Sequence, residues 1–193
     1  MLASLFFSFL NVAHAEEKTE AANNRFIERA TILGHMGEAW ISSNFSKTKS
    51  STAAGATLVV ELNAKNDSTS PRIHGIALVD YDVISLGRGK REYSPSQNLY
   101  LVSSTIAPGL CFAFENSFEG CAAIGFSQLA VSNKDNRLNF GGDTVMFYLP
   151  YYFTESFNAA LMAKNSTSSN RIAGINASFS VTSLALALGW TFE

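Results

Sequence analysis

The residues just before the C-terminal glutamate alternate strictly between large apolar and small side chains. Leu184, Leu186, Leu188, Trp190 and Phe192 share one parity, and the small residues Ser183, Ala185, Ala187, Gly189 and Thr191 share the other. A period of two is that of a β-strand, whose successive side chains point to opposite faces. A water-exposed sheet usually has long polar side chains on its second face, whereas small side chains suit a narrow barrel interior. This segment therefore predicts a strand that faces lipid on one side and a lumen on the other.

The same alternation recurs upstream, over 56–63, 144–153, 157–164 and 173–180. Ionised side chains are scarce after residue 142, which is unusual for a sheet in water. The chain is therefore expected to be all-β, an antiparallel up-and-down transmembrane β-barrel of about ten strands, with eight as the alternative. The expected strands are 28–41, 53–64, 72–84, 97–106, 109–116, 120–131, 142–153, 156–164, 171–181 and 182–192.

The N-terminal segment has the pattern of an export signal. Residues 2–12 are uncharged and mostly apolar, and Ala13-His14-Ala15 has the small-x-small form that signal peptidase accepts. We expect a signal peptide over 1–15, a polar flexible lead-in over 16–27 and a single barrel domain over 28–193. No later stretch reaches the roughly 18 consecutive apolar residues of a spanning helix. Residence in a membrane would then depend on the barrel.

The final strand resembles the C-terminal strand of bacterial outer-membrane barrels. In that class, apolar residues at alternate positions lead to a terminal aromatic residue that the assembly machinery reads, and Leu184 to Phe192 match this pattern. Glu193 is a departure, because it leaves Phe192 penultimate. The resemblance implies a location in the bacterial outer membrane, contact with membrane lipid and insertion by the barrel assembly machinery. It indicates a class of proteins and no single family.

Several ionisable side chains have the parity of the barrel interior. They are Glu61, Arg72, His74, Asp80, Asp82, Glu115 and Lys164. An unpaired buried charge is costly, so we expect these groups to form ion pairs with neighbouring strands across the lumen. His74 and Asp80 are six residues apart, about 20 Å along a strand, and cannot share one site. We therefore expect no catalytic residue, no cofactor and no metal ion.

Two short features invite a functional interpretation. Cys111 and Cys121 flank an expected hairpin and both point inward, so they form either a disulfide, which an oxidising periplasm permits, or two small buried thiols. Between two expected strands, a Gly-flanked run contains Arg88, Lys90 and Arg91. These cations either belong to a solvated loop or contact the phosphates of lipopolysaccharide.

Composition and motifs narrow the function. A net charge of −2 and a pI of about 5.9 give no broad basic field for nucleic acid. The chain lacks a nucleophile elbow, an H-E-x-x-H zinc pair and a phosphate loop, and neither His35 nor His74 has the serine two residues on that lipid A deacylases pair with histidine.

Three hypotheses remain. The leading one is a non-enzymatic outer-membrane barrel in envelope integrity, surface interaction or limited passage of small solutes. The alternative is a secreted or periplasmic soluble barrel that binds an apolar ligand, with its large side chains inward. The third is a lipid-modifying outer-membrane enzyme that uses a serine and His35 near one rim.

Overall fold

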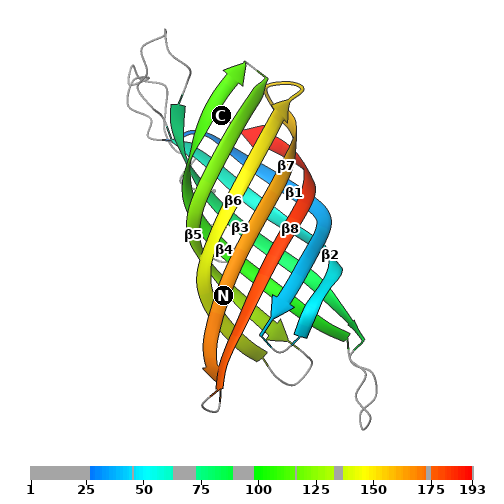
Figure 1. The fold of residues 1–193 in the computed structure, drawn as a ribbon. Coiled ribbons are helices and arrows are strands. Elements are labelled where there is room, and N and C mark those ends of the chain that lie inside the picture. The colour runs from blue at the N-terminus through cyan, green and yellow to red at the C-terminus, as the bar shows by residue number, and fades with distance from the viewer. Residues whose placement is uncertain are drawn as a thin grey trace.

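The computed structural model describes residues 27–44, 46–62, 73–88, 98–115, 117–132, 137–172 and 175–192. They form eight strands, β1 (Ile27–Ser43), β2 (Ser46–Leu62), β3 (Ile73–Arg88), β4 (Asn98–Glu115), β5 (Phe118–Ser132), β6 (Arg137–Tyr152), β7 (Phe157–Ile172) and β8 (Ile175–Phe192). Each strand pairs antiparallel with the next, and β1 pairs with β8, so the sheet closes into an up-and-down barrel (Figure 1). None of the described residues forms a helix long and apolar enough to cross a membrane.

The register of the pairs fixes the geometry of the barrel. Following paired residues once round from Leu33 leads through Thr57, Asp80, Thr105, Ser127, Gly142, Ser168 and Phe179, and returns to β1 at Ser43. The return point is ten residues beyond the start (43 − 33), which is the shear of the barrel. Shear requires the strands to tilt, and their inclination is visible in Figure 1.

The strand number is eight, so the expectation of about ten is corrected to its stated alternative. β4 unites the segments expected at 97–106 and 109–116. β8 unites the segment expected at 182–192 with most of that expected at 171–181, whose first two residues belong to β7. Pro108 does not end β4, because it still pairs with Ala77 of β3. On the other side of β4, the pairing with β5 is interrupted between Ile106 and Gly109. A proline can thus interrupt one ladder without breaking the strand.

The strands are also longer than expected, at 15 to 18 residues. About 9 to 11 tilted residues suffice to cross a bilayer, so each strand has several residues to spare. The interval from Ser132 to Gly142, expected to be a long connection, is mostly strand because β6 begins at Arg137. We call the end at which β1 begins and β8 finishes the terminal end, and the opposite end the far end.

The outward face of the barrel has a broad apolar belt that begins at the terminal end. An aromatic girdle borders it there, made of exposed rings on β4, β5, β6 and β8 and in the turn after β6: Phe114, Phe118, Tyr151, Phe153, Trp190 and Phe192. Isoleucine, leucine, valine, phenylalanine and alanine dominate the outward positions beyond the girdle. Aromatic residues gather at membrane interfaces because their rings are apolar and their edges tolerate water.

Exposed polar side chains end the belt on the far side. Allowing for the stagger of the strands, seven of the eight strands place one at a similar height: Glu38, Thr52, Ser104, Gln128, Asp143, Asn165 and Thr182. We call this set the polar ring; β3 reaches its first exposed outward polar residue slightly later, at Ser85. Between girdle and ring lies a surface suited to lipid, and beyond the ring the strands continue with mostly polar outward faces.

Candidate functional site

The interior of the barrel holds most of its buried ionisable side chains. The expected inward residues Glu61, His74, Asp80, Asp82 and Lys164 all point into the lumen and are at least 95% buried. They fall into two separate groups along the barrel axis, one close to the terminal end and one nearer the polar ring. Of the other two expected lumen charges, Arg72 lies outside the described residues and Glu115 lies at the end of β4.

Arg29 organises the terminal-end ion cluster. Its Nε donates to Glu61 Oε2 at 2.5 Å and its Nη2 donates to Glu119 Oε1 at 2.9 Å, which joins β1, β2 and β5. The guanidinium carbon also lies 4.5 Å from the centroid of the Tyr152 ring, and the Tyr152 hydroxyl donates to Glu61 Oε1 at 3.3 Å. His74 Nε2 lies 3.3 Å from Glu61 Oε2. One cation thus bonds two buried carboxylates through a charge-assisted fork, and its guanidinium also makes a cation–π contact with Tyr152.

Lys164 is the centre of the mid-barrel ion cluster. Its Nζ donates to Asp80 Oδ2 at 2.6 Å and also to Asp82 Oδ2. His35 Nε2 is 3.1 Å from Asp80 Oδ1, and Thr57 Oγ1 donates to the same oxygen at 2.7 Å. All of these side chains are buried, so removing any one partner would leave a charge or polar group unpaired in a medium of low dielectric constant.

Two groups of side chains in the lumen have ligand atoms close enough for a metal ion, but their chemistry favours other bonds. In the set His35, Asp80 and Asp82, the Lys164 ammonium already bonds both carboxylates, so a second cation there would lie next to the lysine charge and meet carboxylates whose charge is partly offset. In the set His74, Cys111 and Glu119, the sulfur of Cys111 is bonded to Cys121 and cannot act as a thiolate ligand.

Apolar side chains fill the lumen around the ion clusters. Leu33, Val59, Ile76, Leu78 and Met146 belong to a buried group between the two clusters. A second group lies toward the far end and includes Ile84, Leu101, Leu129, Phe140 and Val181. The void beside the mid-barrel cluster has a volume of about 10 Å³, close to that of a single water site. Along the described strands the interior is therefore a packed core.

The two cysteines are directly opposite each other on β4 and β5 and form a disulfide, with their Cα atoms 4.0 Å apart. The bond lies on the inner face of the barrel wall, and His74 of the neighbouring strand β3 pairs with Cys111. It joins two strands that a tight turn already connects, ten residues apart in sequence. Because the closed loop is short, the entropic stabilisation expected of the bond is modest.

Of the basic run Arg88, Lys90 and Arg91, only Arg88 belongs to the residues that the structure describes. Arg88 is the last residue of β3, at the far end, while Lys90 and Arg91 lie outside the described residues. Four more cations occupy strand positions beyond the polar ring: Lys47, Lys49, Arg137 and Arg171. The described residues beyond the ring include no aspartate or glutamate. We call Arg88 and these four residues the far-end cations.

The large face of the last strand points outward. Leu184, Leu186, Leu188, Trp190 and Phe192 are 43 to 72% exposed, and the small residues between them face the lumen. The alternative of a soluble barrel with this face lining a ligand cavity is therefore wrong. The hypothesis of a lipid-modifying enzyme required His35 near one rim as a catalytic base. His35 is instead buried in the mid-barrel ion cluster.

Sequence reasoning missed four residues of the terminal-end region. Arg29 and Glu119 were not assigned to the lumen, although each has the parity of inward residues on its own strand. Tyr148 and Tyr152 resemble girdle residues in the sequence, yet both are buried inside the barrel. The sequence could have shown this, because inward and outward positions alternate from Phe140 to Tyr152, and the two tyrosines fall on the same positions as the inward residues Thr144 and Met146.

No family model and no curated protein sequence matches the chain. Solved structures do resemble it. Ail, the attachment invasion locus protein of Yersinia pestis, solved with the heparin analogue sucrose octasulfate, aligns with a TM-score of 0.56 at 11% identity, covering 87% of this chain and 100% of Ail. Neisserial surface protein A aligns with a TM-score of 0.55 at 12% identity, covering 84% of this chain and 97% of that protein. The chain therefore has the fold of small bacterial outer-membrane β-barrels.

Proposed function

We propose that this protein resides in the bacterial outer membrane as a non-enzymatic barrel that acts through its surface and does not conduct solutes. The observation that supports this most strongly is the filled lumen, in which two ion clusters and two apolar groups occupy the space that a channel would need. An eight-stranded barrel has an interior just wide enough for its own side chains. Among the roles expected from the sequence, envelope integrity and surface interaction are therefore favoured over solute passage.

The outer face supports residence in a membrane. The belt between the aromatic girdle and the polar ring offers apolar side chains to lipid on every strand, and closure of the sheet leaves no unpaired edge in hydrocarbon. The polar lead-in before β1 favours an orientation with the terminal end in the periplasm, because its charges then do not have to cross the bilayer. The predicted signal peptide over 1–15 and insertion by the barrel assembly machinery complete this proposal.

In that orientation the far end faces the cell exterior, and we assign the far-end cations to contact with polyanions there. Lys47, Lys49, Arg88, Arg137 and Arg171 would lie near the phosphates of lipopolysaccharide, with Lys90 and Arg91 in the connection after β3. Guanidinium and ammonium groups bind phosphate through charge-assisted hydrogen bonds. Ail has been solved with a sulfated ligand, which is consistent with an anionic partner for this fold.

A conductance measurement tests the proposal. The protein is refolded into planar lipid bilayers, and insertion is verified by a gel mobility that differs between unheated and boiled samples. A general porin serves as the positive control. We expect the inserted barrel to give no discrete conductance steps while resisting carbonate extraction from membranes. Regular conductance steps from the wild-type protein would contradict the closed lumen, and recovery as a soluble monomer without detergent would contradict the membrane location.

A further inference from the structure

The disulfide between Cys111 and Cys121 lies beside other metal-ligating side chains on the inner face of the barrel wall. His74 of β3 pairs with Cys111 of β4, which in turn pairs with Cys121 of β5. Glu119 is two residues before Cys121 and is also buried. A ring nitrogen of His74, the sulfur of Cys111 and a carboxylate oxygen of Glu119 lie within 4.8 Å of one another. The register therefore brings two sulfurs, an imidazole and a carboxylate to one place in the lumen.

Two of these groups have ligand atoms that no hydrogen bond uses. His74 is 1% exposed, and neither of its ring nitrogens makes a hydrogen bond to a described residue, although Nε2 lies 3.3 Å from Glu61 Oε2 and 3.6 Å from Glu119 Oε2. The Oε2 atom of Glu119 is likewise buried and makes no hydrogen bond to a described residue. Buried polar atoms without a partner cost free energy, so this pair indicates a ligand that completes their bonding.

The charges around these groups favour a cation. Among the three side chains that form the fork of the terminal-end ion cluster, two are carboxylates and one is a guanidinium, so one negative charge is not offset. Arg29 donates to Oε1 of Glu119, which leaves Oε2 free on the side of His74. Hydrogen bonds from a neighbouring side chain orient the ligands of many metal sites. A metal ion at Oε2 would therefore meet a carboxylate that is already held in place.

The ligand set specifies the metal. Two thiolates, an imidazole and a carboxylate supply four ligands of the types that Zn²⁺ binds in tetrahedral sites. Mg²⁺ and Ca²⁺ prefer oxygen ligands alone. In the oxidised protein the two sulfurs bond each other and neither is a thiolate, so the set becomes complete only after reduction.

We propose that Cys111, Cys121, His74 and Glu119 form a zinc site that the disulfide closes and reduction opens. A dithiol supplies two electrons to the disulfide, its own sulfurs join as a new disulfide, and its two protons pass to the cysteines. Zn²⁺ then replaces these protons and forms two Zn–S bonds, while the imidazole and the carboxylate complete the coordination. A small-molecule disulfide reverses the process: it joins the cysteine sulfurs, is reduced to two thiols with protons from solvent, and releases the ion.

Both reactants can approach the site from the terminal end. The site lies beside the terminal-end ion cluster, where the side chain of Arg29 is 18% exposed. In the proposed orientation this end faces the periplasm, so occupancy of the site would follow the supply of dithiols and zinc there. The metal site itself does not depend on that orientation, which decides only from which side the ion arrives.

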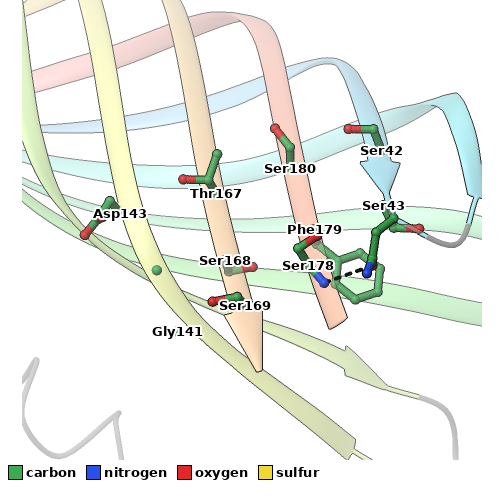
Figure 2. Close-up of a pocket in the computed structure, with 12 residues that line it drawn as sticks. Ser42, Ser43, Gly141, Asp143, Thr167, Ser168, Ser169, Ser178, Phe179 and Ser180 are labelled. Carbon is green, nitrogen blue, oxygen red and sulfur yellow. Dashed lines mark hydrogen bonds between the residues drawn. The ribbon is translucent and has the colours of Figure 1, made fainter. Parts of the chain in front are cut away.

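A carboxylate at the opposite end of the barrel provides a control. An open groove of about 500 Å³ lies across the far ends of β6, β7, β8 and β1, and Figure 2 shows Asp143 and Thr167 on two of these strands. Asp143 is the one carboxylate among the described residues that line this groove, and they include no histidine or cysteine. Nonspecific binding of a divalent cation to an accessible carboxylate would respond to Asp143→Asn, whereas binding at the proposed site would respond to Glu119→Gln.

The test is a metal titration of the barrel refolded in detergent micelles. One preparation is oxidised, and the other is refolded with a dithiol that is then removed without oxygen; heat-modifiable gel mobility verifies folding. Co²⁺ is the probe, because a cobalt–thiolate bond gives charge-transfer absorption in the near ultraviolet, and Zn²⁺ is added afterwards. The site variants are His74→Gln and Glu119→Gln. Their controls are His35→Gln, a buried histidine of the mid-barrel ion cluster, and Asp143→Asn.

We expect the reduced wild-type barrel to bind a single Co²⁺ with the thiolate band, and Zn²⁺ to displace it, because Zn²⁺ binds such sites more tightly. The site variants should bind at least about tenfold more weakly, since even a partner outside the coordination sphere contributes about tenfold or more to metal affinity. Both controls should bind as wild type does. The oxidised barrel should show no thiolate band, and oxidised glutathione should release zinc from the reduced form.

A reduced wild-type chain that does not fold, or a folded one without the cobalt–thiolate band, would overturn the proposal. Unchanged affinity in folded His74→Gln and Glu119→Gln, or an equal loss in the two controls, would place the metal elsewhere and overturn it as well. None of these outcomes touches the proposed function, which fails only if the barrel does not insert or if it conducts.

Discussion

Substitution of Leu186 by arginine tests whether the outward belt lies in lipid. Leu186 is 72% exposed, and its neighbours on the adjacent strands are Met36 and Leu161. It lies six residues before Phe192 of the girdle, about 20 Å along the strand, or about 15 Å along the membrane normal at a tilt of about 40°. The lipid-facing band of such barrels is about 25 Å tall, so Leu186 lies close to its middle.

The magnitude follows from this depth. Arginine at the bilayer midplane of a barrel costs about 2 to 4 kcal/mol of folding free energy, and near the interface about 0 to 1 kcal/mol. Ser178 provides a matched control, since it lies on the same strand and the same outward face. It is fourteen residues before Phe192, about 35 Å along the normal by the same estimate, and so beyond the band. Ser178→Arg should therefore cost about 1 kcal/mol or less.

Both variants are measured by equilibrium unfolding in urea with the protein in lipid vesicles, and the folded fraction is read from the gel mobility of unheated samples. We expect the unfolding free energy of Leu186→Arg to fall by about 2 to 4 kcal/mol and that of Ser178→Arg to change little. Equal losses for the two variants would refute the placement of the belt. A larger loss at Ser178 would mean that the far half of the strand, and not the half next to the girdle, is in lipid.

Two further predictions concern the lumen. Lys164→Met should lower the unfolding free energy by about 3 to 5 kcal/mol, because it leaves two buried carboxylates unpaired. Adding Asp80→Asn and Asp82→Asn to this variant should recover part of the loss. A Lys164→Met variant as stable as wild type would show that the pairing is not needed. Oxidised protein that is unfolded without reductant should show no free thiol in a colorimetric titration and two after reduction. Two thiols before reduction would rule out the bond between Cys111 and Cys121.

Much of the architecture could be predicted from local sequence pattern. Alternation with a period of two needs only neighbouring residues, so it identified the outward face of 184–192 and the inward parity of Asp80, Asp82 and Lys164. The strand count was harder to predict because proline and polar residues usually mark strand ends. At Pro108 one neighbouring strand keeps the alignment, and the polar half of β8 continues as strand beyond the belt.

The partners of the buried charges depended on the tertiary structure. Lys164 meets Asp80, 84 residues earlier in the chain, and Arg29 meets Glu119, 90 residues later. Parity restricts each side chain to the lumen but gives no height, which depends on the register of every pair and on the shear of the closed barrel. Sequence therefore determined which residues face inward, and only closure of the eight strands decided which of them lie at the same level and neutralise one another.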